Sequence, residues 1–219
     1  DFRLAKGHVA SLSGDYDRAL GAYEESLAYA STDSLRSVVW GMIGDTWHLK
    51  ATEGVTDWDE RMDLGTIKPT AVFRKGMKRC YSAYERSLRY DPDNTMVLNN
   101  YAYFLSVEGR DLERALAMSS RVVALEDDNP TYLDTHAWVL HKLGRTDEAK
   151  KIQQRAVVLD GQKSPSLLAH YGDMLHALGE QFMAEIYWRQ ALEKGYDPAL
   201  IEPRLKQPAA DRNSEKTSR

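Results

Sequence analysis

Histidine and aspartate are the residue types through which this sequence could do chemistry. The chain has six histidines, and two of them follow an aspartate by three residues, in the pairs Asp45/His48 and Asp173/His176. Residues three apart lie on one face of a helix, so each pair could offer two ligands to a divalent metal ion. No third ligand accompanies either pair, and a protein metal site needs at least three. The simpler interpretation is solvated polar groups, and we expect no metal and no cofactor.

The familiar enzyme motifs are missing from the sequence. It contains no His-Glu-x-x-His, no Gly-x-Ser-x-Gly and no Rossmann glycine run. Gly161 to Ser164 resembles the end of a phosphate loop, but Ala156 stands where the first glycine is required. The single cysteine, Cys80, excludes an intrachain disulfide and a multi-cysteine metal site. We therefore expect a protein that is not an enzyme, with a metal-dependent enzyme using the histidines as the alternative.

Composition places the chain among globular proteins. Of its 219 residues, 42% are hydrophobic and 28% are charged. The 33 acidic and 29 basic residues give a formal charge of -4. They are scattered without an evident basic stripe, so nucleic acid is not expected as a partner. Charges also interrupt every apolar stretch, so no transmembrane segment is expected. The chain opens on Asp1 without a leader pattern, which favours a fragment or a mature form.

Repeated columns of small and large residues predict the elements that position these side chains. Ala102, Ala137 and Gly172 stand 35 residues apart, each flanked by large residues, and Trp40 to Trp47 carries an earlier copy of the pattern. A second column places a small residue four before a larger one: Ala19/Tyr23, Cys80/Tyr84, Ala149/Gln153 and Ala184/Trp188. Spacings of three and four put each set on one face of a helix. These columns predict closely packed helix pairs, with Cys80 as a buried spacer.

Turn and cap residues punctuate the helices at the same period. Gly14, Gly144 and Gly179 each stand between two predicted helices, where a left-handed residue must end the first. Asn129-Pro130 and Ser164-Pro165 each offer a capping side chain and a proline for the first turn of the next helix. Columns and punctuation together resemble the tetratricopeptide repeat family over about residues 1–196.

The resemblance implies an all-α fold, a right-handed superhelical solenoid of about five helix-turn-helix hairpins. Their expected bounds are 2–31, 37–92, 95–127, 130–161 and 165–195. An insert at 52–76 interrupts the second hairpin, and residues 197–219 are expected to form a capping segment followed by a disordered tail. Within the insert, Asp57 to Leu64 could form a short helix. The insert either contacts a partner or packs as part of an elongated hairpin.

In this family the first helices of the hairpins line a concave groove, which implies a set of partner-binding residues. In this sequence the set is Asp45, His48, Asn99, Tyr103, Asp134, Trp138, His141, Lys142, Asp173 and His176. Tyr103 and Trp138 are either exposed anchors for a bound peptide or packing residues against the neighbouring helix. Lys142 and Asn99 are too few among acids and histidines for a chaperone-type carboxylate clamp, which is therefore not expected.

The resemblance thus implies a binding module or scaffold for a protein or peptide partner. The alternatives are the metal-dependent enzyme above and a regulatory adaptor for a nucleic-acid-binding protein. The last three hairpins also resemble repeats in bacterial proteins of the Bacteroidetes type, many of them envelope-associated. This similarity implies the bacterial envelope, as a periplasmic protein or lipoprotein, with the cytoplasm as the alternative. The sequence specifies neither the partner nor the oligomeric state.

Overall fold

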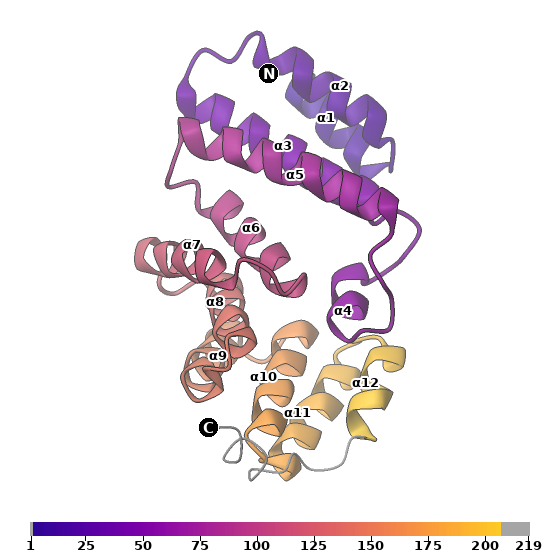
Figure 1. Ribbon diagram of the computed structural model, residues 1–219, viewed down its shortest axis with the longest axis vertical. Coiled ribbons are helices and arrows are strands. Elements are labelled where there is room, and N and C mark those ends of the chain that lie inside the picture. Colours follow the sequence, from indigo (N-terminus) through magenta and orange to yellow (C-terminus); the bar gives the residue numbers. More distant parts are fainter. Residues whose placement is uncertain (1, 207–219) are drawn as a thin grey trace. The chain divides into compact units, whose positions relative to one another are not determined.

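The computed structural model describes residues 2–206 and forms only helices over that range (Figure 1). This confirms the all-α prediction. The helices are α1 Phe2–Leu12, α2 Tyr16–Leu27, α3 Asp33–Ala51, α4 Trp58–Asp63, α5 Ala71–Tyr90, α6 Thr95–Val107, α7 Leu112–Leu125, α8 Pro130–Lys142, α9 Thr146–Asp160, α10 Pro165–Ala177, α11 Gln181–Glu193 and α12 Pro198–Leu205. The expected tail from residue 207 onward lies outside the described residues. The chain divides into two compact units, Asp1–Tyr101 and Ala102–Arg219.

The first unit contains two antiparallel helix pairs. Helices α1 and α2 form one pair, and the long helices α3 and α5 form the other, with α2 also packed on α3. Between them lies a core in which Tyr23 of α2 meets Val39 and Ile43 of α3. All three of these side chains are buried. The apolar stripe of each helix therefore faces its pair partner, as the repeat columns predict.

The small residues of the first helices lie directly against large residues of the second. A Cβ atom added at Gly44 would come within 2.4 Å of the Tyr84 ring, and one at Gly172 would come within 2.4 Å of the Trp188 ring. Both rings are buried. Such distances are far inside van der Waals contact, so a side chain at either glycine would have to displace an aromatic ring. The two columns in the sequence are thus the two sides of one packing contact.

The insert of the second hairpin is shorter than expected. Because α5 already begins at Ala71, the connection covers residues 52–70, and the expected end at residue 76 is wrong. Thr70 caps α5 by accepting a hydrogen bond from the backbone N–H of Phe73. The Trp58 side chain of α4 is buried and stacks on Phe73, with ring centroids 5.0 Å apart. This contact favours the elongated-hairpin interpretation over a segment free to contact a partner.

The second unit stacks α8 with α9 and α10 with α11, and α12 packs on α11. Asn129 and Ser164 cap α8 and α10 as predicted, and a proline follows each in the first turn. Gly144 and Gly179 have φ angles of 78° and 74°, the left-handed conformation expected at the ends of first helices. These local signals fix where each helix begins and ends, and so which residues face α8 and α10.

Candidate partner-binding surface

The predicted groove residues divide by burial into two groups. Asn99, Asp134 and Trp138 are buried. The others are half-buried: Asp45, His48, Tyr103, His141, Lys142, Asp173 and His176. Asp45, His48 and Asn99 belong to the first unit and the remaining seven to the second. Buried residues cannot be reached by a partner, so the expectation that the whole set lines an open surface is wrong for three of its members.

Asp45 and His48 have separate partners rather than a common ligand. The Tyr84 hydroxyl donates a hydrogen bond to Asp45 Oδ1, and Asn100 Nδ2 donates a second at 3.1 Å. Burial raises the pKa of Asp45 despite these donors. His48 Nε2 lies 3.1 Å from Asp59 of α4, an ion pair whenever the histidine is protonated. Asp45 thus joins α3 to α5 and to the middle of α6, while His48 joins α3 to α4 of the insert.

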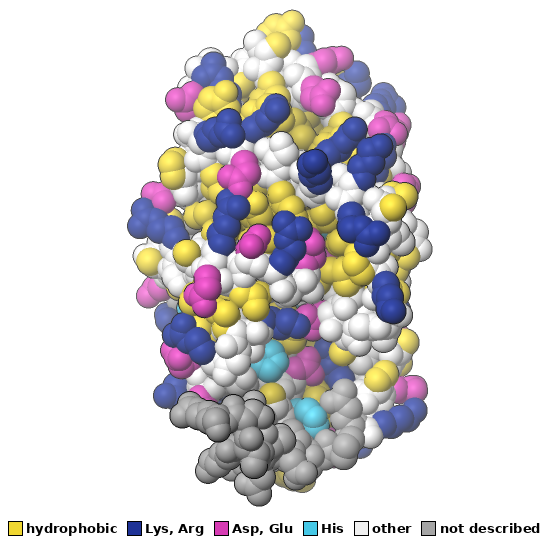
Figure 2. All heavy atoms as spheres, in the orientation of Figure 1, with side chains coloured by type: hydrophobic (Ala, Val, Ile, Leu, Met, Phe, Trp, Pro, Cys, Tyr) yellow, Lys and Arg dark blue, Asp and Glu magenta, His cyan; other side chains and the backbone are white. Residues whose placement is uncertain are grey.

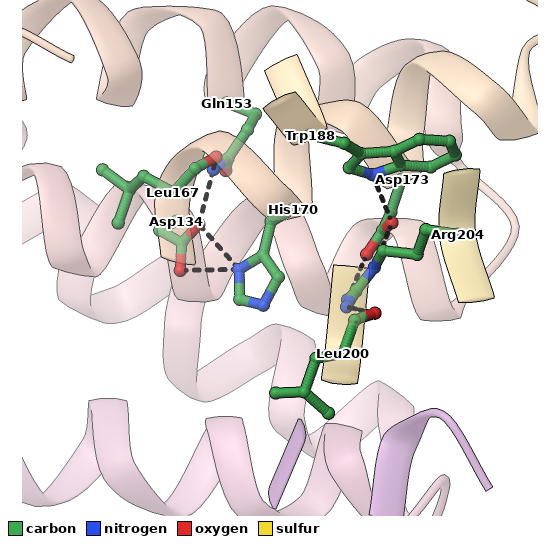
Figure 3. Close-up of polar contacts among 8 residues, drawn as sticks. All are labelled: Asp134, Gln153, Leu167, His170, Asp173, Trp188, Leu200 and Arg204. Carbon is green, nitrogen blue, oxygen red and sulfur yellow. Dashed lines mark hydrogen bonds and ion pairs between the residues drawn. The ribbon is translucent and has the colours of Figure 1, made fainter. Parts of the chain in front are cut away.

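Asp134 is the centre of a buried polar network (Figure 3). His170 Nδ1 lies 3.0 and 3.1 Å from its two carboxylate oxygens. Gln153 Nε2 donates to the same carboxylate and, at 3.0 Å, to the Leu167 carbonyl. The network therefore connects α8, α9 and α10. A buried carboxylate held by two partners stabilises one packing arrangement of these helices, because leaving it unpaired would be costly.

Asp173, which is half-buried, is likewise bound by residues of other helices, here α11 and α12 (Figure 3). Arg204 donates to both of its carboxylate oxygens at 2.8 Å, and Trp188 Nε1 donates to Oδ1 at 2.9 Å. His176, the other member of the pair, places Nδ1 at 2.6 Å from Gln181 Oε1. Arg204 was not singled out in the sequence, because its partner lies 31 residues away and only the fold brings them together.

A metal-binding role has no support from these positions. Within residues 2–206, no three histidine, cysteine, aspartate or glutamate side chains are grouped so that they could hold an ion. The two Asp/His pairs direct their side chains to different protein partners, as described above. In the same part of the chain, no helix is both long enough and apolar enough to cross a membrane.

The exposed-anchor interpretation is wrong for Trp138. Its side chain is 3% exposed and stacks on His170, with ring centroids 4.2 Å apart. It shares a core cluster with Leu140 and Met174. Tyr103 is half-buried and packs against that cluster from outside. Trp138 is therefore a packing residue. Of the two aromatic side chains, Tyr103 is the one that is accessible to a partner.

His141 should make the second unit sensitive to acid. Burial lowers the pKa of His141 from 6.5 to about 4, against a smaller opposing effect of Asp173 and with Lys142 and His170 adding to it. Above pH 6.5 the ring is neutral in both states. Between pH 6.5 and 4 the unfolded chain binds a proton that the folded chain does not, so stability falls as the pH falls, by roughly 3 kcal/mol in all.

Replacing His141 by glutamine should therefore flatten the loss of stability between pH 6.5 and 4, measured by urea unfolding at each pH. His8→Gln, at an exposed position of the first unit, is the matched control and should leave the slope unchanged. An identical slope for wild type and His141→Gln would contradict the prediction.

One surface was missed in the sequence. Helix α5 has a local excess of positive charge, since it carries six lysines and arginines and one glutamate. The expectation that charges are scattered without a basic stripe is wrong for this helix. The net charge summed over a window of helical length, rather than over the whole chain, would have shown this excess of lysine and arginine.

Comparison with known proteins identifies the repeat family and the solved structures to which this chain is similar. Residues 131–163, which cover α8 and α9, match the tetratricopeptide repeat family. No curated protein matches the sequence. Among solved structures, PilF of Pseudomonas aeruginosa is similar with a TM-score of 0.69 at 18% identity, over 94% of this chain and 82% of that chain.

Two further structures have the same helical arrangement. YrrB, described as a TPR protein with an unusual peptide-binding site, gives a TM-score of 0.60 at 16% identity, over 94% of this chain and 91% of that chain. MamA from Desulfovibrio magneticus gives 0.62 at 14% identity, over 88% and 93%. Such identities show a common fold alone. Residues 131–163 thus match a tetratricopeptide repeat, and the chain has the fold of a tetratricopeptide-repeat protein.

Proposed function

We propose that this chain is a non-enzymatic scaffold that holds a segment of another protein on the first-helix surface of its second unit. The observation that carries the proposal is a group of buried, tightly held side chains bordered by half-buried ones. We call the half-buried ones the rim: Tyr103, His141, Lys142 and His176. Asp134, Trp138 and His170 are locked in the core. Tyr103 and Lys142 are half-buried and retain surface that a partner could contact. Positions held by rigid elements lose little entropy when a partner binds.

The rim has the composition of a modest peptide-binding surface. Tyr103 offers an aromatic face beside the Trp138 cluster, and Lys142 Nζ lies 5.8 Å from the Trp138 ring centroid. His141 and His176 lie partly exposed on the last turns of α8 and α10. An aromatic anchor flanked by a cation and imidazoles suits a segment with one apolar residue and hydrogen-bonding neighbours.

Tyr103→Ala tests this proposal. Truncating an anchor should weaken partner binding by roughly 2 kcal/mol, about 30-fold, because the ring would be covered in the complex. The partner would be identified by pull-down from the source organism, purified, and titrated by calorimetry against wild type and variant. Phe182→Ala is the control, since Phe182 is an exposed aromatic on α11 of the same unit. Equal affinity of Tyr103→Ala and wild type would contradict this surface.

The two competing functions are less well supported. A metal-dependent enzyme would need a ligand group that residues 2–206 do not provide. A regulatory adaptor for a nucleic-acid-binding protein would still be a protein-binding scaffold, and the identity of the purified partner would separate it from other scaffolds.

A further inference from the structure

A groove along α3 and α5 of the first unit combines aromatic and cationic side chains. It consists of three adjoining hollows of about 310, 240 and 420 Å³. Trp47 and Arg79 line both the first and the second hollow, and Trp40 and Arg86 line both the second and the third. Since neighbouring hollows share walls, they form one continuous surface, which we call the α3–α5 groove.

Each shared wall is an arginine whose guanidinium lies over a tryptophan ring. The guanidinium carbon of Arg79 lies 4.3 Å from the Trp47 ring centroid, and that of Arg86 lies 4.6 Å from the Trp40 ring centroid. A guanidinium over an aromatic ring is attracted to the ring face without using up its five N–H donors, which stay available to a ligand. This attraction also holds the arginine in place, so less entropy is lost when a ligand binds.

The groove is positively charged in a chain that is acidic overall. Lys75, Arg79, Arg86 and Arg89 of α5 all line it and are exposed. Among the described residues none of these four has an ion-pair partner. Figure 2 shows lysine and arginine side chains lying among hydrophobic ones over the upper helices of the view. Four cations with exposed apolar neighbours favour a ligand that carries both negative charge and apolar groups.

We propose that the α3–α5 groove binds an acidic segment of a partner protein, in which carboxylates pair with Arg79 and Arg86 and apolar side chains occupy the hollow that the two arginines share. A carboxylate matches the forked donors of an arginine in a bidentate pair. The apolar components of the walls include the two tryptophans and Val72, which is 70% exposed. This site is separate from the second-unit surface proposed above and does not depend on it.

The spacing of the two arginines sets the pattern of the segment. Arg86 follows Arg79 by seven positions on α5, a rise of about 10 Å. Three residues of extended chain also cover about 10 Å. An extended segment with acidic residues at positions i and i+3, and at least one apolar residue between them, therefore fits both arginines and the hollow that they share.

Charges in the walls favour such a segment over nucleic acid. Glu24 lines the central hollow and Glu53 lines the first. A phosphate backbone carries a charge at every nucleotide and would meet these carboxylates. A protein segment can place an apolar or neutral residue opposite each of them. The same carboxylates disfavour a uniformly acidic ligand and make the apolar residues of the segment part of recognition.

A displayed library of random 12-residue peptides, selected on the purified chain, tests the proposal. We expect enriched peptides to carry aspartate or glutamate three residues apart with apolar residues between. The tightest peptide would then be fluorescently labelled and titrated by anisotropy. Replacing both groove arginines, in Arg79→Gln/Arg86→Gln, should weaken its binding at least about tenfold, because two charge-assisted contacts are lost. Trp40→Leu should weaken it too.

Arg74→Gln/Lys78→Gln is the matched control. It removes the same charge from the same helix, at exposed residues that line none of the three hollows. An equal loss in both double variants would reduce the effect to a general positive field and overturn the proposal. So would selected peptides that are not acidic, or tighter binding of a 12-nucleotide oligouridylate or of phosphatidylserine vesicles than of the selected peptide. Circular dichroism of each variant confirms that it is folded.

Discussion

Replacing Trp138 by alanine is expected to cost about 3–5 kcal/mol of folding stability. The side chain is 3% exposed and stacks on the His170 ring, which is itself 2% exposed and bound to Asp134. Truncation would leave a large cavity next to a buried polar network, and both the lost apolar burial and the cavity reduce stability. Urea unfolding followed by circular dichroism measures the difference from wild type.

Phe182→Ala is the control for this experiment as well. Phe182 is 76% exposed on the same unit, so the loss should stay within about 0.5 kcal/mol. If Trp138→Ala were as stable as Phe182→Ala but bound its partner poorly, Trp138 would be an exposed anchor after all. The affinity per folded molecule, measured on the same samples, separates the two outcomes.

The repeat columns could be predicted because their residues contact each other within a single helix pair, and the same contact recurs from one pair to another. Gly172 and Trp188 stand 16 residues apart, and the same relation recurs between Gly44 and Tyr84 despite the intervening insert. Local helix signals were predictable for the same reason: Asn129 caps the helix that it precedes. A pattern repeated along the chain, or a cap next to its helix, needs no knowledge of the three-dimensional arrangement.

The burial of the groove residues could not be predicted in this way. Position on a first helix indicates which way a side chain points, but not what lies in front of it. Asp134 is covered because His170 and Gln153 come from two other helices. Asp173 is covered because α12, which lies outside the repeat pattern, brings in Arg204. Each of these contacts joins residues with no common motif, and only the packed structure relates them.

The cationic groove was missed for a different reason. Net charge averages over the whole chain, and the acidic residues elsewhere conceal a helix with six cations and one acid. Even the helix composition would not have located the groove, since its walls require Trp40 and Trp47 of α3 beneath the arginines. The charge summed over a window of helical length would have shown the cations of α5. The position of the two tryptophans beside them follows only from the packing of α3 on α5.

Arg204→Met is expected to cost about 3–5 kcal/mol, because it removes one partner of a buried ion pair and leaves the other in place. The Arg204 side chain is 2% exposed, and that of Asp173 is 16% exposed. Methionine retains most of the apolar volume but none of the donors, including the one that Arg204 gives to the Leu200 carbonyl at 3.0 Å. Trp188 Nε1 remains as a donor to Asp173, so the carboxylate keeps one hydrogen bond and loses its charge partner.

A double-mutant cycle isolates the ion pair from the packing of α12. Asp173→Asn keeps an oxygen that can accept from Trp188 while removing the charge, so Arg204→Met/Asp173→Asn should be more stable than the sum of the single losses predicts, by about 1–3 kcal/mol. Lys206→Met, two residues further along the chain, is the control. Lys206 is 78% exposed and pairs with Glu202 at 3.7 Å, a surface contact worth less than about 1 kcal/mol. Additive losses in the cycle would show that Arg204 acts through packing alone and that Asp173 does not depend on its charge. Hydrogen exchange of the α12 amides shows whether the loss is confined to undocking of that helix or spreads through the second unit, as the contact of Asp173 with Trp188 predicts.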